Sequence, residues 1–423
     1  SHNPSKYNGY KVYNAAGHQA TDEESEKILS LMEQVDIFGG ARHIPFAEAQ
    51  KSPLFSYIGD ETKALYVDRV MREAVCSADS QADIAAAMKA LRVVYTPLNG
   101  SGSKPVQEIM RRLAIGAVHT VKEQEEPDGT FPTCPYPNPE SRDALALGIA
   151  LFEETGADIL IGTDPDCDRM GIAVRATDGS CRLLTGNETG LLLFDYIIRN
   201  RRRAGTMPAR PVAVRTIVSS RLIDRIAAAN GIDLKVTLTG FKYIGEFIES
   251  LSRQGRERDY IFGYEESYGY LSGTYVRDKD GVNAALMVCC LAAEAKANGE
   301  TLDRSLERIY KTYGYARNDL MNFTFEGISG MKEMDAIMGK FRTAGPDTIA
   351  GKKTKRIIDY KNDDTGLPKS NVIEYILEDG SGFSVRPSGT EPKLKIYTYA
   401  VGDTAAETDA TAEALQKALS DLI

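Results

Sequence analysis

Two stretches of the chain share one pattern of apolar and polar positions. Each begins with a short run rich in β-branched residues, LRVVYT at 91–96 and PVAVRTIV at 211–218. A turn rich in serine or glycine follows, and then an amphipathic helix that ends at a glycine, Gly116 in the first stretch and Gly231 in the second. The pattern predicts two similar βα units, and therefore parallel or mixed sheets with helices on both faces.

Two further apolar runs, ADILIG at 157–162 and RDYIFG at 258–263, are typical of buried strands. Each ends directly at a cluster of acidic residues. Because ligands of open α/β sheets bind beyond the carboxyl ends of the strands, both clusters are candidates for a functional site.

The pattern changes after about residue 316. From there to the end, alternating strands dominate and helices are expected near 329–344 and 404–423, which predicts a separate α+β domain. The expected fold class is therefore α/β, with repeated α/β domains followed by this C-terminal α+β domain. We expect the domains to comprise residues 1–61, 62–182, 183–315 and 316–423.

Composition narrows the range of partners. The chain has 423 residues, 42% of them hydrophobic, which is enough to bury several cores. Its formal net charge of −9 argues against a nucleic-acid partner, whereas a small anionic substrate needs only a few converging basic residues. No apolar run reaches the roughly 18 residues of a membrane span, and the polar start does not resemble a signal peptide. Nothing in the sequence indicates an oligomeric state.

The cysteines and histidines give no metal or disulfide pattern. None of the six cysteines forms a C-x-x-C pair, and the four histidines are widely separated. Cys289 and Cys290 are adjacent within the apolar stretch AALMVCCLAAEA, so they are expected to be reduced and buried. Reduced cysteines are typical of cytoplasmic proteins, so we expect this protein to be cytoplasmic.

Three carboxylates follow the first of the two acidic strands, at Asp164, Asp166 and Asp168. If the segment stays extended, their side chains point to one side and form a hard oxygen site that favours Mg²⁺ over zinc. An EF-hand loop is excluded, because Arg169 stands where that loop needs glycine and Arg175 where it needs a bidentate glutamate. A solvated acidic loop without a metal is the remaining alternative.

The second acidic strand leads into Gly263-Tyr264-Glu265-Glu266-Ser267-Tyr268-Gly269. Two carboxylates and a hydroxyl in a loop flanked by glycines suit the hydroxyls of a sugar, which need both acceptors and a donor. An ordinary exposed loop explains this segment equally well.

Two shorter motifs complete the candidates. Between two predicted strands, Arg386-Pro387-Ser388-Gly389-Thr390-Glu391-Pro392-Lys393 offers two hydroxyls and free backbone N–H groups behind an arginine, which favours phosphate binding over a simple hairpin loop. At the start of the chain, Ser1-His2-Asn3-Pro4 is by itself more typical of a surface turn than of a functional site.

The order and spacing of these motifs are more specific than any one of them. S-H-N-P, D-P-D-x-D-R, G-x-E-E-S and R-P-S-G-T-E-P follow one another along the whole chain. This arrangement resembles the α-D-phosphohexomutase family. The resemblance implies a four-domain architecture around one cleft, in which three domains share an α/β topology and the last is α+β. Family members carry further residues before the first motif, so we expect part of the first domain to be missing from this sequence.

The resemblance implies a role for each motif. Ser1 would be the phosphoserine that donates its phosphoryl group. Asp164, Asp166 and Asp168 would bind Mg²⁺ together with an oxygen of that phosphoserine, and Arg169 would be the partner of this loop.

Further roles follow from the same resemblance. The residues near the reacting oxygen would be His2, Lys11 and Lys279; a lysine acting as the base would first have to lose its proton. The sugar would be contacted by Glu265, Ser267 and Lys242, the last in the loop Thr239-Gly240-Phe241-Lys242. The phosphate that is not transferred would be held by Arg386, Ser388, Gly389 and Thr390.

The implied reaction moves a phosphoryl group between O1 and O6 of a hexose. Phospho-Ser1 would convert a hexose monophosphate to a bisphosphate, which turns over in the cleft and returns its other phosphate to Ser1. The Glu-Glu-Ser loop favours glucose 1-phosphate and glucose 6-phosphate as substrates, with glucose 1,6-bisphosphate as intermediate and activator. The alternatives are phosphomannomutase or phosphopentomutase activity, or a fragment that binds sugar phosphates without turnover.

Overall fold

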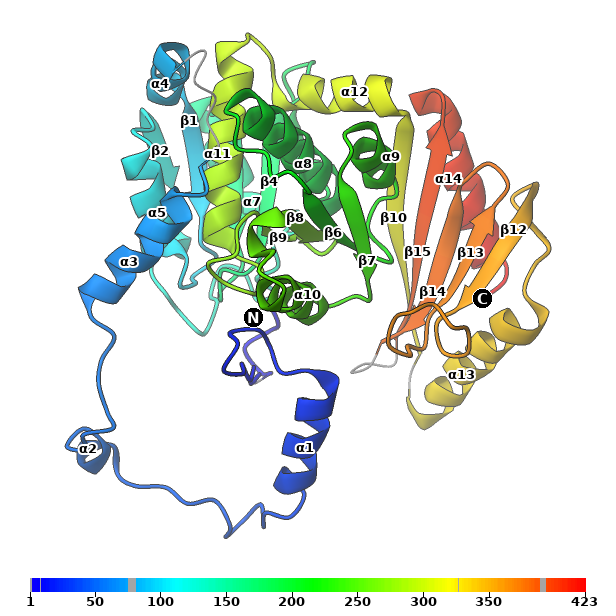
Figure 1. Cartoon of the computed structure of the whole chain (residues 1–423), viewed down its shortest axis with the longest axis horizontal. Helices are drawn as coiled ribbons and strands as arrows, with labels where there is room; N and C mark the ends of the chain where they lie inside the picture. The colour runs from blue at the N-terminus through cyan, green and yellow to red at the C-terminus, as the bar shows by residue number, and fades with distance from the viewer. Residues whose placement is uncertain (1, 8, 75–80, 326, 389–392) are drawn as a thin grey trace.

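The structure is a computed structural model that describes every residue except 1, 8, 75–80, 326 and 389–392. The described residues form a large α/β body and a C-terminal sheet domain beside it (Figure 1). Beneath them lies an N-terminal arm, which comprises the described residues before residue 60. This arrangement confirms the expected fold class of α/β domains followed by an α+β domain.

The first sheet has the strand order β2-β1-β3-β4-β5. Its strand β1 runs parallel to β2 and β3, and β4 and β5 continue antiparallel. The boundary expected at residue 182 falls inside β5, so this sheet extends beyond it. The strands are β1 (Arg92–Thr96), β2 (Ala117–Thr120), β3 (Ile159–Thr163), β4 (Met170–Arg175) and β5 (Cys181–Leu184), and the helices around them are α3 (Asp60–Met71), α4 (Gln81–Ala90), α5 (Ser103–Arg112), α6 (Lys122–Glu125) and α7 (Ala146–Thr155).

The second sheet has the strand order β7-β6-β8-β9, with β6 parallel to both β7 and β8. Both predicted βα units are therefore present, one in each sheet. The strands are β6 (Val212–Thr216), β7 (Asp233–Thr237), β8 (Tyr260–Glu265) and β9 (Gly269–Leu271), and the helices are α8 (Gly186–Arg203), α9 (Leu222–Ala229), α10 (Phe241–Arg253), α11 (Gly281–Ala297) and α12 (Leu302–Tyr313), with a short 3₁₀ turn at Glu257–Asp259.

Helix α11 joins the two sheets into one body. Every residue from Gly281 to Ala295 is buried, because the helix is apolar all round and has protein on all sides. Its side chains belong to one hydrophobic cluster that also contains residues of β1, β3, β4, α8 and β8. The adjacent Cys289 and Cys290 lie buried in this cluster, as predicted.

The C-terminal domain is a six-stranded sheet with the order β10-β15-β14-β13-β12-β11, and all its pairs are antiparallel. It has its own hydrophobic core. A small apolar cluster that includes Val218, Leu238, Tyr360 and Val372 connects it to the second sheet. The elements are β10 (Tyr315–Thr324), α13 (Gly327–Ala344), β11 (Thr348–Ile349), β12 (Lys352–Asp359), β13 (Ile373–Leu377), β14 (Gly382–Pro387), β15 (Lys393–Gly402) and α14 (Ala405–Ser420).

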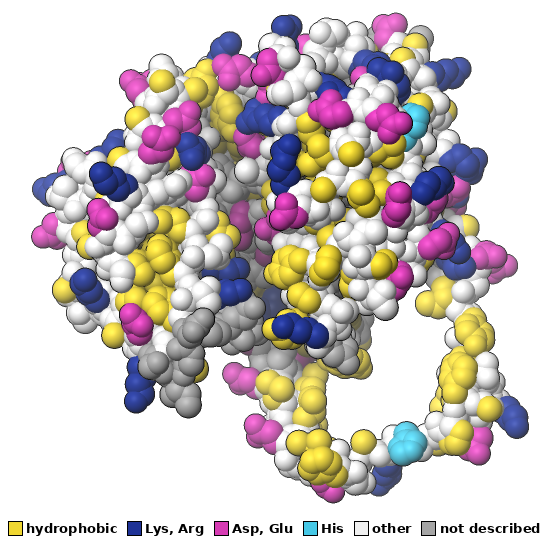
Figure 2. Space-filling view, turned by 180° about the vertical axis from the view of Figure 1, so that it is seen from behind, with side chains coloured by type: hydrophobic (Ala, Val, Ile, Leu, Met, Phe, Trp, Pro, Cys, Tyr) yellow, Lys and Arg dark blue, Asp and Glu magenta, His cyan; other side chains and the backbone are white. Residues whose placement is uncertain are grey.

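The N-terminal arm differs from the rest of the chain. Its helices α1 (Asp22–Met32) and α2 (Phe46–Ala49) contain no buried residue. Large apolar side chains along it are exposed, for example Phe38 at 98% and Leu54 at 96%. Figure 2 shows hydrophobic side chains gathered along the projecting segment. No helix in the described ranges is long and apolar enough to cross a membrane.

Candidate active site

Described residues of the predicted motifs line one cleft of about 830 Å³, which we call the central cleft, and a pocket of about 440 Å³ beside it. Asp166, Asp168 and Lys11 line the smaller pocket, and Lys279 lines both. The large body contributes one side of the central cleft through Arg169 and the loop of Glu265, Glu266 and Ser267, and His2 reaches the same cleft from the N-terminal arm. The C-terminal domain contributes the other through β14 and β15, including Arg386, Lys395 and Tyr397. The cleft is strongly polar, as a site for a charged and hydroxylated ligand must be.

The acidic loop, residues 164–168, directly follows β3 and is not extended. Cys167 adopts a left-handed conformation with φ of +56°, and its N–H donates to the carbonyl of Asp164 at 2.9 Å, which closes a tight turn. The turn, rather than strand alternation, brings the three carboxylates together: Asp164, Asp166 and Asp168 each place an oxygen within 4.8 Å of the others. The expected extended geometry is therefore wrong, although the expected convergence is present.

Two glycines hold this loop from opposite directions. A Cβ on Gly100 would lie 2.3 Å from Cα of Pro165, so only glycine allows the loop after β1 to approach this closely. The neighbouring Ser101 N–H donates to the Pro165 carbonyl at 2.8 Å, and the Gly281 N–H at the start of α11 donates to the Cys167 carbonyl at 2.9 Å. The carboxylates are thus positioned by packed backbone.

The donor set fits a hard divalent cation. Asp164 is fully buried; its Oδ1 accepts the N–H groups of Asp168 at 3.0 Å and Arg169 at 2.9 Å, whereas its Oδ2 has no hydrogen-bond partner among the described residues. Burial and the neighbouring carboxylates raise the pKa of Asp164 well above its ordinary value. A cation bound by the three carboxylate oxygens would give Oδ2 of Asp164 a partner and would stabilise the ionised form of Asp164. Mg²⁺ is therefore the ion that these residues suit.

Two lysines contact the acidic loop. Lys11 Nζ lies 2.7 Å from Oδ2 of Asp166 and 2.6 Å from Oδ2 of Asp168, and Lys279 Nζ lies 3.0 Å from the same Asp168 oxygen. Burial lowers the pKa of each lysine, but the carboxylates outweigh it and raise both above the ordinary value. In this arrangement both side chains are ammonium ions that neutralise the loop.

Arg169 faces the cleft from the same loop. Its Nη1 donates to Oε1 of Glu140 at 2.9 Å, a residue that the sequence did not single out. Burial and the nearby Arg169 charge lower the pKa of His2 to about 4, so its ring is neutral at pH 7. His2 therefore lies at the cleft as the motif predicted, whereas Ser1 is outside the described residues.

The loop that contains Glu266 and Ser267 follows β8, whose last residue is Glu265. Glu265 is 5% exposed, and its Oε1 accepts the N–H of Gly240 at 2.7 Å. Gly240 has φ of +116°, which favours glycine, and it begins helix α10. The structure thus brings the Glu265 loop and the Gly240 loop together. Lys242 was expected to contact the substrate, but it does not line the central cleft. Its ammonium group instead pairs with Asp22 of the N-terminal arm.

The phosphate motif lies at the end of β14. Arg386 lines the cleft, and the Ser388 N–H donates to the carbonyl of Lys393 at 2.7 Å. Gly389 and Thr390 are outside the described residues. Arg386 pairs in register with Lys395 of β15, so both side chains stand on one face of the sheet.

Sequence reasoning missed Lys395 and Tyr397. Strand alternation after the phosphate motif could have found both, because residues 393, 395 and 397 share one face of β15 and all line the cleft. Burial and the charge of Arg386 lower the pKa of Lys395 below its ordinary value. Two cations held side by side in this way favour a bound anion between them.

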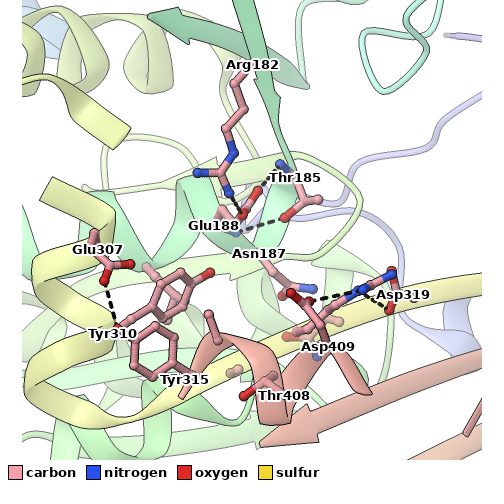
Figure 3. A pocket seen from close by; sticks show the side chains of 15 residues that line it. Arg182, Thr185, Asn187, Glu188, Glu307, Tyr310, Tyr315, Asp319, Thr408 and Asp409 are labelled. Atoms are coloured by element: carbon pink, nitrogen blue, oxygen red, sulfur yellow. Dashed lines mark hydrogen bonds and ion pairs between the residues drawn. The ribbon is translucent and has the colours of Figure 1, made fainter. Parts of the chain in front are cut away.

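A second cavity, of about 420 Å³, lies where α8, α12, β10 and α14 meet (Figure 3). Its charged side chains pair with one another, Arg182 with Glu188 and Arg317 with Asp409. Because these charges are already neutralised, the cavity has less to offer an anionic ligand than the central cleft.

Comparison with known proteins assigns all four domains of the chain to one family. Four profiles of phosphoglucomutase/phosphomannomutase match in order: α/β/α domain I at residues 1–37, domain II at 64–179, domain III at 185–313 and the C-terminal domain at 320–417. A protein named phosphoglucomutase from Staphylococcus aureus (strain USA300) is 36% identical over 409 residues, which is 94% of this chain and 70% of the relative.

Solved structures share the fold. The Paramecium phosphoprotein parafusin, a phosphoglucomutase in an open form, aligns with a TM-score of 0.69 at 18% identity, over 99% of this chain and 74% of its own. A putative phosphomannomutase from Thermus thermophilus aligns with a TM-score of 0.65 at 20% identity, over 99% and 76%. An N-acetylphosphoglucosamine mutase from Aspergillus fumigatus, in complex with GlcNAc-6P and magnesium, aligns with a TM-score of 0.53 at 14% identity, over 100% and 87%. The chain belongs to the phosphoglucomutase/phosphomannomutase family of α-D-phosphohexomutases.

Proposed function

We propose that this protein interconverts glucose 1-phosphate and glucose 6-phosphate through a phosphoserine at Ser1 and a glucose 1,6-bisphosphate intermediate. The observation that carries the proposal is a continuous arrangement of charged groups: the Glu-Glu-Ser loop and the cations of β14 and β15 line the central cleft, and Lys279 of the same cleft contacts the acidic loop, which lines the adjoining pocket with Lys11. The relative named phosphoglucomutase supports glucose as the sugar. Hexose phosphates are accordingly the proposed ligands.

The chemistry of the reaction matches these groups. The phosphorus–oxygen bond to Ser1 breaks as phosphorus bonds to a sugar hydroxyl oxygen; the hydroxyl proton passes to a basic group of the cleft, and the released serine oxygen takes up a proton. Charge on the oxygens of the transferring group has to be neutralised, which Lys11, Lys279 and Arg169 can do from beside the acidic loop. The second phosphate of the ligand binds between Arg386 and Lys395.

The acidic loop holds the proposed metal. Asp164, Asp166 and Asp168 would bind Mg²⁺, and a phosphoserine oxygen would complete its ligands. When bound, the ion acts as a Lewis acid that stabilises negative charge on the transferring phosphoryl group. Because Lys11 and Lys279 now contact Asp166 and Asp168, we expect both ammonium groups to move from the carboxylates toward the phosphoryl oxygens when the ion enters.

Glu265 and Ser267 are the proposed contacts of the sugar hydroxyls. The hexose has to present O1 in one half-reaction and O6 in the other, while the phosphoserine stays in place. O3 and O4 occupy similar positions in the two orientations, so one pair of side chains can serve both. We also place the enzyme in the cytoplasm, because none of the six cysteines forms a C-x-x-C pair and Cys289 and Cys290 are buried within α11.

The proposal is tested by locating the phosphoryl group and then the substrate. The full chain is incubated with glucose 1,6-bisphosphate and Mg²⁺, and we expect mass spectrometry to find one phosphate on the peptide containing Ser1. A coupled assay with glucose 1-phosphate, mannose 1-phosphate and ribose 1-phosphate should show the highest kcat/KM for glucose 1-phosphate. Phosphate on Ser1 with a preference for mannose would make the protein a phosphomannomutase. Binding of all three without a phosphoserine would identify a sugar-phosphate-binding protein without turnover.

A further inference from the structure

Glu266 is a carboxylate of the central cleft to which the proposed reaction assigns no role. It directly follows β8 and lines the cleft beside Glu265. The Thr216 hydroxyl donates to its Oε2 at 3.1 Å, and Thr216 itself is fully buried and in contact with Ser219 Oγ at 2.8 Å. The side chain is therefore tethered at one oxygen while facing the ligand site.

The backbone of Glu266 is fixed as well. A Cβ on Gly186, the first residue of α8, would lie 2.0 Å from the Glu266 carbonyl oxygen. The start of this 18-residue helix thus packs directly on the loop. Glu266 cannot move away from the cleft without displacing α8.

Charged and titratable groups surround Glu266 from three elements. Strand β8 contributes Tyr264 and Glu265, both of which interact electrostatically with Glu266. Glu140 faces it from the segment before α7. On the opposite side of the cleft, Lys395 and Tyr397 of β15 face it from the C-terminal domain, on the same sheet face as Arg386. Glu266 therefore lies opposite the cations that bind the second phosphate in the proposed function.

A carboxylate in this position has two opposite effects on a phosphate ligand. When ionised, it attracts Lys395 and repels a phosphate dianion. When protonated, it has an O–H group that can donate a hydrogen bond to a phosphate or hydroxyl oxygen of the ligand. Burial and then the charge of Glu265 raise the pKa of Glu266 to about 7, so both forms are populated near neutral pH.

We propose that Glu266 is a proton-carrying ligand of the sugar phosphate: its carboxyl group is neutral in the occupied cleft and donates a hydrogen bond to the bound ligand. The proton is taken from solvent as the ligand binds and is released as it leaves. This inference rests on the proposed function, because that function supplies the phosphate. It makes Glu266 a residue that couples ligand binding to pH.

The test is proton linkage measured with glucose 6-phosphate and Mg²⁺, in the absence of bisphosphate so that no turnover occurs. Calorimetry at pH 7.5 in two buffers with different ionisation enthalpies counts the protons taken up. We expect roughly 0.8 proton per bound ligand, and a Kd that rises about five- to tenfold per pH unit between about pH 7.5 and 8.5. The ligand itself does not titrate there, since the second pKa of a phosphomonoester is about 6.

Three variants assign the proton. Glu266→Gln keeps a neutral hydrogen-bond donor of the same shape, so we expect uptake near zero and a Kd that changes less than about twofold over this range. Lys395→Arg replaces a facing lysine by a cation that does not titrate in this range, and Glu140→Gln removes a second facing carboxyl group. We expect both to keep the uptake and the slope of the original protein.

Each outcome decides the inference. Binding without proton uptake in the unmodified protein overturns it, whatever the variants do. Uptake that persists in Glu266→Gln, or disappears in Glu140→Gln or Lys395→Arg instead, assigns the proton to another group and also overturns it. If the unmodified protein does not bind glucose 6-phosphate at all, the proposed function fails first, and this inference fails with it.

Discussion

Charged side chains are arranged in opposite ways on the acidic loop, beside the central cleft, and on the C-terminal side of that cleft. On the acidic loop, opposite charges are in contact: two lysines lie 2.6–3.0 Å from the carboxylates of Asp166 and Asp168. On the C-terminal domain, like charges are neighbours, because Arg386 and Lys395 occupy paired positions of β14 and β15. The first side is neutralised by the protein itself, whereas the second has a cationic excess that a ligand can satisfy.

This difference separates two tasks. A loop whose charges are paired and whose backbone is fixed by Gly100 and Gly281 suits a reacting centre that must keep its geometry. A pair of cations that face the cleft from a separate domain suits ligand capture. Changes on the acidic loop should therefore reduce the rate of the chemical step, and changes on β14 and β15 should reduce affinity.

The largest effect is expected on the acidic loop. Asp166→Asn should lower kcat at saturating Mg²⁺ by at least about a hundredfold, or roughly 2.7 kcal/mol of transition-state stabilisation, because one hard ligand is lost. The matched control is Asp178→Asn, an exposed aspartate in the hairpin turn between β4 and β5, which should leave kcat unchanged. Near-normal turnover in Asp166→Asn would remove the metal site from the mechanism.

The next effect is expected on the cationic side. Arg386→Ala should weaken binding of glucose 6-phosphate by roughly 2–4 kcal/mol, or about 30- to 1000-fold, because a charge-assisted contact to phosphate is lost. Arg356→Ala, at an exposed position of β12 in the same domain, is the control. The measurement is Kd by calorimetry together with kcat at saturating substrate. A fall in kcat with an unchanged Kd would contradict the division of tasks.

A smaller effect is expected between the two sides. Glu265→Ala should reduce kcat/KM in both reaction directions by similar factors, corresponding to about 1–3 kcal/mol, because sugar hydroxyls lose their acceptor in both orientations. Formation of phospho-Ser1 should be preserved. Glu265→Gln is the informative comparison, since its amide oxygen can still accept from the Gly240 N–H. A loss confined to one direction would show that Glu265 contacts only one orientation.

The smallest effect on turnover is expected from changes in the packing around the acidic loop. Gly100→Ala places a methyl group against the backbone of Pro165 and should cost about 1–3 kcal/mol, shared between the free energy of unfolding and Mg²⁺ affinity. Gly129→Ala is the control, because no atom lies within 4 Å of its Cβ position. Thermal unfolding without Mg²⁺ measures the loss of stability, and the additional stabilisation when Mg²⁺ is added measures the change in Mg²⁺ affinity. Equal behaviour of the two variants would show that the loop tolerates displacement.

Sequence patterns predicted the fold because its strands are buried and regular. The run ADILIG at 157–162 became β3 at Ile159–Thr163, and RDYIFG at 258–263 became β8 at Tyr260–Glu265. The long apolar stretch around Cys289 became the buried helix α11. An apolar run indicates that a segment is buried, but not which other segments it packs against. The shared core of the first two sheets around α11 therefore could not be predicted.

The site was predictable where its residues stand in motifs. Asp164, Glu265 and Arg386 lie where the motifs placed them, at the ends of the strands β3, β8 and β14. The turn at Cys167 was missed because its left-handed backbone has no sequence signal. Lys242 was placed at the substrate, but its contact with Asp22 depends on the path of the N-terminal arm.

The start of α11 connects the reacting centre with the stability of the whole body. The Gly281 amide proton is hydrogen-bonded to the acidic loop, and the helix that it begins is buried between two sheets along nearly its whole length. A local opening of the acidic loop would have to break this hydrogen bond, and the first turn of α11 cannot fray to allow it because that turn is buried. Amide exchange at Gly281 should therefore follow global unfolding, which makes the acidic loop part of the slowest-exchanging unit of the protein rather than one of its mobile loops.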